Sequence, residues 1–248
     1  MGTRSLGDRP WLVHDEDLEH DLGLKDELLR TKRDEVLHTT DESTEAASAL
    51  AELVGSPASY DNEMHPIEAA ARTVQADLCL LQRQPTGWHL DASCLCFPTR
   101  WRLRDKVGLH IAQVHGPVDG YDPRITDKVD RLFDQLTTRP VWRRNWFLMT
   151  DTTLHQPTRP ERETIIAASD VMSDLYIRSE RQTLRQVVDR WIVFTIRIQQ
   201  VALGQILTTN ERRQQFATWV EHVSDDFGAR RHLTAPQRTQ LLTALHAT

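Results

Sequence analysis

Apolar residues recur along this chain with two periods, and each period predicts a different kind of secondary structure. Alternation at every second residue is typical of a strand with one buried face, and Ile192, Phe194 and Ile196 show it clearly. Continuous apolar runs that end at turn residues also favour strands. On these two patterns the expected strands cover residues 77–83, 88–97, 141–150, 175–184 and 190–199.

Spacings of three and four residues predict helices between and around these strands. The clearest helix follows Pro123, where Ile125, Val129 and Leu132 lie on one face and the stripe continues to Leu136. Strands joined mostly as hairpins, with helices between them, predict an α+β fold. The other expected helices cover residues 18–36 (as one or two helices), 44–53, 67–74, 164–173, 202–207, 211–226 and 236–247.

A chain of 248 residues can form one large domain or two small ones. The succession of elements favours one structural domain with three regions. We expect a helical region over residues 1–75 packed on the sheet, a core over residues 76–200, and C-terminal helices over residues 201–248.

The segment between the second and third expected strands carries an apolar helical stripe, and we expect one helix from about Pro98 to His115. His115 directly precedes Gly116-Pro117, so it would lie at the helix C-terminus, where an imidazole can serve as a metal ligand. His110 lies in the middle of the same apolar face. A histidine that is merely hydrogen-bonded is the commoner case for either position, and the stripe alone does not choose between them.

One strand carries a row of polar or amphipathic side chains on a single face: Tyr176, Arg178, Glu180 and Gln182. Such a row is either a solvent-exposed face or the wall of a polar cavity. Antiparallel sheets commonly have one wet side, so the row alone favours the exposed face.

A second strand places Trp142, Arg144, Trp146 and Leu148 on one face, with Asn145 between two of them. Two interpretations remain open for this strand. It is either a core strand with solvated neighbours, or a strand that supplies Arg144 and Trp146 to a binding site.

Composition excludes several classes of function. The net charge of −6 argues against nucleic acid as the main partner, and no dinucleotide or nucleoside triphosphate motif is present. Cys79, Cys94 and Cys96 are too few for a four-thiolate iron–sulfur site and are expected to be reduced core thiols. No run of 18 apolar residues and no signal-peptide pattern occur, so we expect a soluble, cytoplasmic protein.

Several separated blocks of the chain resemble the α-subunit family of haem-dependent oxidative N-demethylases. The family pattern has Phe-Pro, Trp, Lys-Val/Ile-Gly and Ile/Val-His-x-Pro-Val in this order, and further blocks lie on either side. The matching positions are Phe97-Pro98, Trp101, Lys106-Val107-Gly108, Val114-His115-Gly116-Pro117-Val118, Arg144-Asn145-Trp146, and residues 75–81 and 178–184.

The resemblance implies a PAS-like antiparallel sheet of about five strands with surrounding helices, which holds haem b. It implies that His115, not His110, ligates the haem iron. Glu180 becomes a candidate for binding a cationic amine, and Tyr121, which follows the His-x-Pro-Val element, a candidate to approach the pocket. At Asp119 the sequence departs from the family, which usually has a second proline there. The candidate residues for holding haem and its propionates are Arg144, Trp146, Arg178 and Arg181.

The function that the resemblance implies is that of a haem-dependent monooxygenase, an oxidoreductase that demethylates a small methylated amine such as dimethylamine and releases formaldehyde. Because the chain carries no reductase motif, the electrons are expected from a flavin and iron–sulfur reductase partner, and the resemblance also allows a formaldehyde-handling subunit. The alternatives are a haem-binding PAS-like sensor or binding module without turnover, and a PAS-like domain that binds a small organic ligand without haem.

Overall fold

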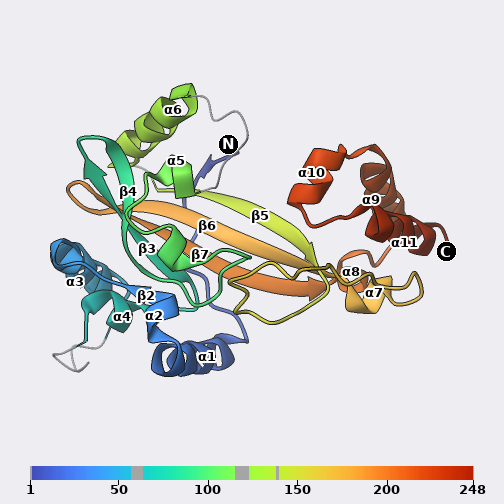
Figure 1. Ribbon diagram of the computed structural model, residues 1–248, viewed down its shortest axis with the longest axis horizontal. Coiled ribbons are helices and arrows are strands. Elements are labelled where there is room, and N and C mark those ends of the chain that lie inside the picture. Colours follow the sequence, from blue (N-terminus) through green and yellow to red (C-terminus); the bar gives the residue numbers. More distant parts are fainter. Residues whose placement is uncertain (1, 57–63, 115–122, 138–139, 248) are drawn as a thin grey trace. The chain divides into compact units, whose positions relative to one another are not determined.

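A computed structural model describes residues 2–56, 64–114, 123–137 and 140–247 of the chain (Figure 1). In this described part the strands form one sheet in the order β1-β5-β6-β7-β3-β4-β2. The pairs β1–β5, β2–β4, β3–β4 and β3–β7 are antiparallel. The strands are β1 (Arg4–Ser5), β2 (Leu37–His38), β3 (Asp77–Gln84), β4 (Gly87–Cys94), β5 (Val141–Met149), β6 (Tyr176–Val188) and β7 (Trp191–Ala202).

The expected α+β class is confirmed, and the five long strands lie where apolar runs and alternation predict them. The expected number of five strands is wrong, because the sheet of the described residues has seven. The two extra strands, β1 and β2, lie at the sheet edges and have two residues each, which is too short for alternation to be visible in the sequence.

The chain divides into two compact units. Unit 1 comprises Met1–Arg143, His155–Thr158 and Arg181–Arg197, and unit 2 comprises Arg144–Leu154, Arg159–Glu180 and Ile198–Thr248. Strands β5, β6 and β7 each contribute residues to both units. The division into three regions at residues 75 and 200 stays a prediction.

Unit 1 begins with helices that accompany the β3–β4 hairpin, and α3 and α4 lie side by side there (Figure 1). Alanines at their contact, including Ala46, Ala47 and Ala70, are fully buried, which lets the two helices pack closely. The helices are α1 (Leu18–Thr31), α2 (Arg33–Val36), η1 (Asp41–Ser43), α3 (Thr44–Leu53) and α4 (Pro66–Ala71).

A buried lysine fixes α1 against the start of β3. Lys25 is fully buried, and its Nζ donates hydrogen bonds to the carbonyl oxygens of Val74 at 2.9 Å and Ala76 at 2.6 Å. The same nitrogen lies 3.7 Å from Asp77 Oδ1, so the buried charge has both carbonyl and carboxylate partners. Asp77 in turn accepts hydrogen bonds from the backbone N–H groups of Cys96 and Phe97.

The prediction of one continuous helix from about Pro98 to His115 is wrong. The described part of this segment contains only the short helices η2 (Leu103–Asp105) and α5 (Ile111–Val114). Its backbone bonds to β4 instead, since Gly108 N donates to Leu90 O at 2.7 Å and Leu90 N donates to Leu109 O at 3.1 Å. Gly108 has φ +76°, a left-handed conformation that glycine adopts easily and that ends a regular helix.

The helix expected after Pro123 is confirmed. It forms α6 (Pro123–Asp134), continued by η3 (Gln135–Thr137). Val129, Phe133 and Leu136 are buried, in agreement with the apolar stripe.

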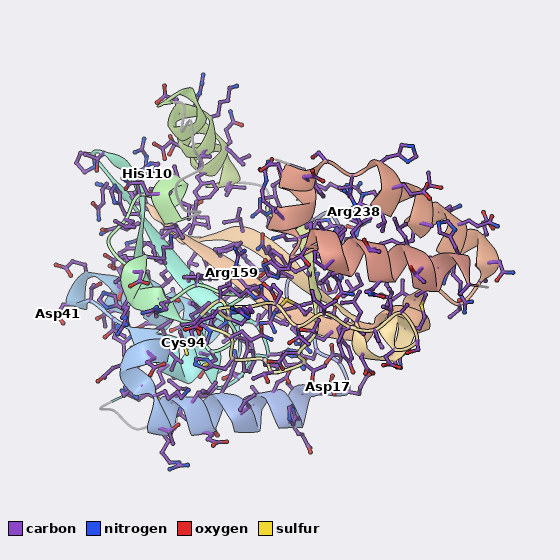
Figure 2. All side chains as sticks on the ribbon, turned by 45° about the vertical axis from the view of Figure 1, so that its right-hand side comes forward. Asp17, Asp41, Cys94, His110, Arg159 and Arg238 are labelled. Atoms are coloured by element: carbon purple, nitrogen blue, oxygen red, sulfur yellow. The ribbon has the colours of Figure 1, made fainter. Side chains whose placement is uncertain are left out.

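Unit 2 contains a helical cluster with its own apolar core (Figure 1). Val171, Leu203, Val220 and Leu241 are at most 1% exposed in this core. Arg238, labelled in Figure 2, lies on the last helix and donates from Nε to the carbonyl oxygen of Val220 at 2.8 Å, near the C-terminal end of the helix over Asn210–His222. The helices are α7 (Val171–Asp174), α8 (Leu203–Ile206), α9 (Asn210–His222), α10 (Asp225–Arg230) and α11 (Ala235–His246).

The helix expected over residues 164–173 is mostly absent, and only the four-residue α7 forms near its end. Backbone groups of this segment bond to a side chain of α11 instead. Ile166 N donates to Gln237 Oε1 at 2.9 Å, and Gln237 Nε2 donates to Ile166 O at 3.4 Å. Ile166 and Gln237 are 71 positions apart in the sequence, too far for a helical or strand period to signal their contact.

None of the helices in the described ranges combines the length and the apolar character that crossing a membrane requires.

Candidate functional site

Three of the four side chains in the polar row on β6 are buried, and Tyr176 is half-buried. Arg178 is 0% exposed, and Glu180 and Gln182 are each 6% exposed. The alternative that this row forms a solvent-exposed face is therefore wrong. Buried charges are costly unless they are paired or hydrogen-bonded, so the partners of these side chains decide what the row can do.

Glu180 belongs to a chain of three side chains within unit 2. Asn145 on β5 donates from Nδ2 to Glu180 Oε2 at 3.2 Å, and the guanidinium of Arg231 donates to the amide oxygen of Asn145. Arg231 also donates to Trp146 O at 2.8 Å, and its guanidinium carbon lies 4.8 Å from the centre of the Phe227 ring. These contacts fix the amide of Asn145 with its N–H groups toward Glu180.

The two predicted site residues on β5 are held by neighbouring side chains of unit 2. Arg144 donates from Nη1 to Ser179 Oγ at 2.8 Å and to Gln199 Oε1 at 3.2 Å. The indole of Trp146 packs edge to face on Trp219, with the ring centres 5.2 Å apart. Their role toward a cofactor stays a prediction.

The two predicted arginines of β6 both contact main-chain carbonyl groups. Arg178 donates to Thr153 O at 3.2 Å and to Leu154 O at 2.9 Å within unit 2. Arg181 donates to Trp11 O at 2.7 Å, and to the carbonyl of the residue before it, within unit 1. These hydrogen bonds hold loops in place. They do not test the prediction that either arginine contacts the haem propionates.

His115 and Tyr121 lie outside the described residues, so their predicted roles stay predictions. His110 is described, and Figure 2 shows it on the segment that leads into α5. Ala112 N donates to its Nδ1 at 3.1 Å, so the ring proton is on Nε2 and is donated to Asp130 Oδ1 at 3.0 Å. Both ring nitrogens of His110 therefore have partners, which agrees with its interpretation as a hydrogen-bonded histidine.

A second buried histidine, His155, has one ring nitrogen without a hydrogen-bond partner. Its side chain is 9% exposed, and Nδ1 donates to Cys96 O at 2.8 Å. Nε2 lies in a cavity of about 260 Å³ in unit 1, 3.9 Å from Glu35 Oε2, and makes no hydrogen bond. The cavity is lined by Glu35, Leu95, Pro98, Trp101, Arg102, Leu103, Arg104, His155, Pro157 and Thr158.

The sequence analysis missed His155 because it lies in an irregular segment without apolar periodicity. One signal was available, since His155-Gln156-Pro157 repeats the His-x-Pro order of His115-Gly116-Pro117. Two of the residues that carry the family resemblance, Pro98 and Trp101, line the same cavity.

The three cysteines are poor candidates for binding iron. All three are free and buried, and Figure 2 shows Cys94, whose Sγ lies 3.9 Å from Cys96 Sγ. Burial raises the pKa of Cys79 to about 12, and the neighbouring Cys94 together with burial raises the pKa of Cys96 well above its usual value. The metal ligand is the thiolate, so the raised pKa values of Cys79 and Cys96 do not favour metal binding by these two thiols. No group of three metal-binding side chains occurs among the described residues.

The described residues form an α+β fold whose sheet carries a buried row of polar side chains. The chain belongs to the family described as haem-dependent oxidative N-demethylase, alpha subunit-like, whose model matches residues 54–237. The suspected family is thereby confirmed. A comparison with curated proteins finds no match.

The family description names haem, so the chemistry of haem can be compared with the described residues. Haem has an apolar ring, two carboxylates and an iron that takes an axial protein ligand. On the neighbouring strands β5 and β6, Arg144 and Arg178 carry guanidinium groups, which suit carboxylates, and Trp146 carries an apolar ring. Arg178 is fully buried and already donates to main-chain carbonyl groups, so its contact with haem stays a prediction. The expected axial ligand, His115, lies outside the described residues.

Proposed function

We propose that this chain is the haem-binding subunit of a monooxygenase that demethylates a small methylated amine, with dimethylamine as the model substrate. The observation that carries the proposal is the buried carboxylate of Glu180, oriented by Asn145, in a member of this family. One methyl carbon is oxidised to formaldehyde, and the oxygen atoms of dioxygen end in formaldehyde and water. Two electrons and two protons complete the balance.

Activation of dioxygen toward an N-methyl C–H bond is the chemistry that haem b supplies when bound. In this proposal His115 would bind the haem iron, and Arg144, Arg178 and Arg181 are the candidates to hold the haem carboxylates. Trp146 supplies apolar surface to the ring. The five long strands form the PAS-like core, which the resemblance implies and which the pairing of the β3–β4 hairpin with β7 supports.

Glu180 binds the cationic substrate. A small dialkylamine is protonated at neutral pH and has little apolar surface, so a buried site needs an anion to offset its lost hydration. Glu180 is buried, and the hydrogen bond from Asn145 to its Oε2 orients the carboxylate. The carboxylate can also accept the ammonium proton, which leaves the neutral amine for oxidation. Tyr121 is a further candidate to contact the substrate.

The electrons come from a partner. An alpha subunit-like family implies further subunits. We propose a flavin and iron–sulfur reductase as the electron donor, and a formaldehyde-handling subunit as a second candidate partner.

Spectra of the haem-loaded protein test the axial ligand. His115→Ala should lose the Soret band, or lose its shift when carbon monoxide is added after reduction, because the protein bond to iron is removed. His110→Ala is the matched control and should keep the spectrum, since both of its ring nitrogens are already occupied. Loss of the band with His110→Ala and its retention with His115→Ala would show that the assignment of the ligand is wrong.

Turnover separates the enzyme from the sensor. Haem-loaded protein, dimethylamine and a reductase system should release formaldehyde, and protein without haem should not. If haem stays bound but no amine in a methylated panel yields formaldehyde, the haem-binding sensor is the better description.

A further inference from the structure

In the cavity around His155, two hydrogen-bond acceptors face each other without a donor between them. His155 uses its Nδ1 proton for Cys96 O at 2.8 Å, so Nε2 of the neutral ring carries a lone pair. Glu35, whose side chain is 53% exposed, faces it with Oε2 at 3.9 Å. An ionised carboxylate only accepts hydrogen bonds, so neither group can satisfy the other while the imidazole is neutral.

This arrangement calls for a ligand that donates. Nε2 of His155 has no hydrogen-bond partner although its side chain is nine-tenths buried, and such a group is costly when it remains unpaired. The distance of 3.9 Å between the two acceptors allows one nitrogen with two N–H bonds to reach both at ordinary hydrogen-bond length.

We propose that this cavity in unit 1 binds a small alkylammonium ion. Its N–H groups donate to His155 Nε2 and Glu35 Oε2, and its alkyl groups contact the apolar wall formed by Leu95, Pro98 and Trp101. A cation against the face of an indole is attracted by the ring, and Trp101 provides that ring.

The two arginines that line the cavity do not turn it into an anion site in this proposal. Arg102 and Arg104 each have a carboxylate nearby, because their Nε atoms lie 4.0 Å and 3.8 Å from oxygens of Asp105. Both arginine side chains are also largely exposed, at 47% and 65%, whereas the unpaired acceptor is buried. An anionic ligand would leave His155 Nε2 without a donor.

This site is separate from the amine site proposed at Glu180. All residues that line the cavity belong to unit 1, whereas Glu180 belongs to unit 2. Binding here requires neither haem nor turnover. Failure of this proposal would therefore leave the proposed function untouched, and the reverse also holds.

The experiment is a titration of the full-length protein with dimethylammonium chloride, followed by NMR of ¹³C-labelled histidine and ¹⁵N-labelled tryptophan. At pH 8 an ordinary imidazole is neutral and a dialkylamine remains largely protonated. The ring signals of His155 and the indole of Trp101 should shift in a saturable way. The signals of His110, whose ring nitrogens both have partners, should stay in place, and sodium chloride should shift none of them.

Two variants on one helix give a matched comparison. Glu35→Gln keeps the shape of the side chain and removes its charge, so binding should weaken at least about tenfold, as expected for a hydrogen bond to a charged group. Asp34→Asn removes a charge from the neighbouring residue of α2, which does not line the cavity, and should leave the affinity within about twofold. Glu35 is largely exposed, so its variant is expected to fold.

Three results would overturn the proposal. If sodium acetate shifts the signals of His155 and Trp101 and dimethylammonium does not, the cavity is an anion site that uses Arg102 or Arg104. Equal losses of affinity in the two variants would reduce the effect to general surface charge. A haem-loaded His155→Gln protein that loses its Soret band would place iron, not an ammonium ion, at Nε2.

Discussion

At the scale of single residues, the buried charges differ in the kind of partner they have. Lys25 and Arg178 donate to main-chain carbonyl groups, so their charges hold backbone segments in position. Glu180 accepts from the side chain of Asn145, which is itself held by Arg231. Neighbouring side chains therefore orient Glu180, and such orientation is what a preorganised ligand site would require.

The charge of Glu180 gives the first prediction. Glu180→Gln keeps the shape and removes the charge, so it should weaken amine binding at least about tenfold, or roughly 1.4 kcal/mol, and leave the haem spectrum nearly unchanged. Titration of the haem spectrum with amine measures this for the wild type and the variant.

The control for Glu180 is Glu211→Gln, which changes an exposed glutamate of α9 that bonds to Gln215 one turn away. It should cost well under about 1 kcal/mol of stability and leave amine binding unchanged. Equal amine affinities for the wild type and Glu180→Gln would remove Glu180 from the site.

At the scale of elements, the β3–β4 turn depends on a glycine that lies against the segment before α5. Gly87 has φ +121°, and a Cβ there would lie 2.3 Å from His110 Nε2 and 2.6 Å from Asp130 Oδ2. Gly87→Ala should therefore lower the free energy of unfolding by at least about 2 kcal/mol, through backbone strain and loss of the His110–Asp130 pair. Urea unfolding followed by circular dichroism measures it.

Gly108 provides the matched comparison for Gly87. It also has a positive φ, +76°, but a Cβ there meets no atom within 4 Å. Gly108→Ala should cost only the conformational strain, about 1 kcal/mol. If both variants lose the same free energy of unfolding, crowding against His110 and Asp130 contributes nothing to the effect of Gly87→Ala.

The elements that the sequence predicts correctly are those with a local signal. Alternation locates the long strands, and the stripe after Pro123 locates α6. The central helix fails because backbone bonds to β4, such as Gly108 N to Leu90 O, replace the helical ones. The turn between β6 and β7 lacks proline and glycine, yet Arg190 adopts φ +60° there and its guanidinium donates to Arg83 O. Such partners lie far away in the sequence, and periodicity carries no information about them.

The candidate site shows the same limit. The resemblance identifies Glu180 as a functional candidate, and its burial excludes the exposed-face alternative. Its connection through Asn145 to Arg231 joins positions 86 residues apart, and no spacing rule reaches that far. The pair of His155 and Glu35 is likewise a product of the tertiary fold.

At the scale of the molecule, the N-terminal helices are tied to the rest of unit 1 by charges. Asp21 on α1 lies 3.1 Å from Arg197 Nη1 on β7, and both side chains are buried. Glu68 on α4 is 1% exposed and lies 2.5 Å from Arg33 Nη2 and 2.8 Å from Arg72 Nη2. Burial by itself would raise the pKa of Glu68, but the hydrogen bonds from the two arginines outweigh it, so the pKa lies below its usual value.

This direction fixes how stability should depend on pH. Because the pKa of Glu68 is lower in the folded state than in the unfolded chain, its contribution is complete above the unfolded value of 4.5 and is lost as pH falls through the folded value. At pH 7, Glu68→Gln leaves two arginines without their buried partner and should cost about 3 kcal/mol. The difference in unfolding free energy between the wild type and this variant should shrink below about pH 4.5, whereas Glu27→Gln, an exposed change on α1, should show no such trend. Urea unfolding at a series of pH values from 7 to 3 measures both, and a difference that stays constant with pH would show that the arginines do not hold Glu68 ionised.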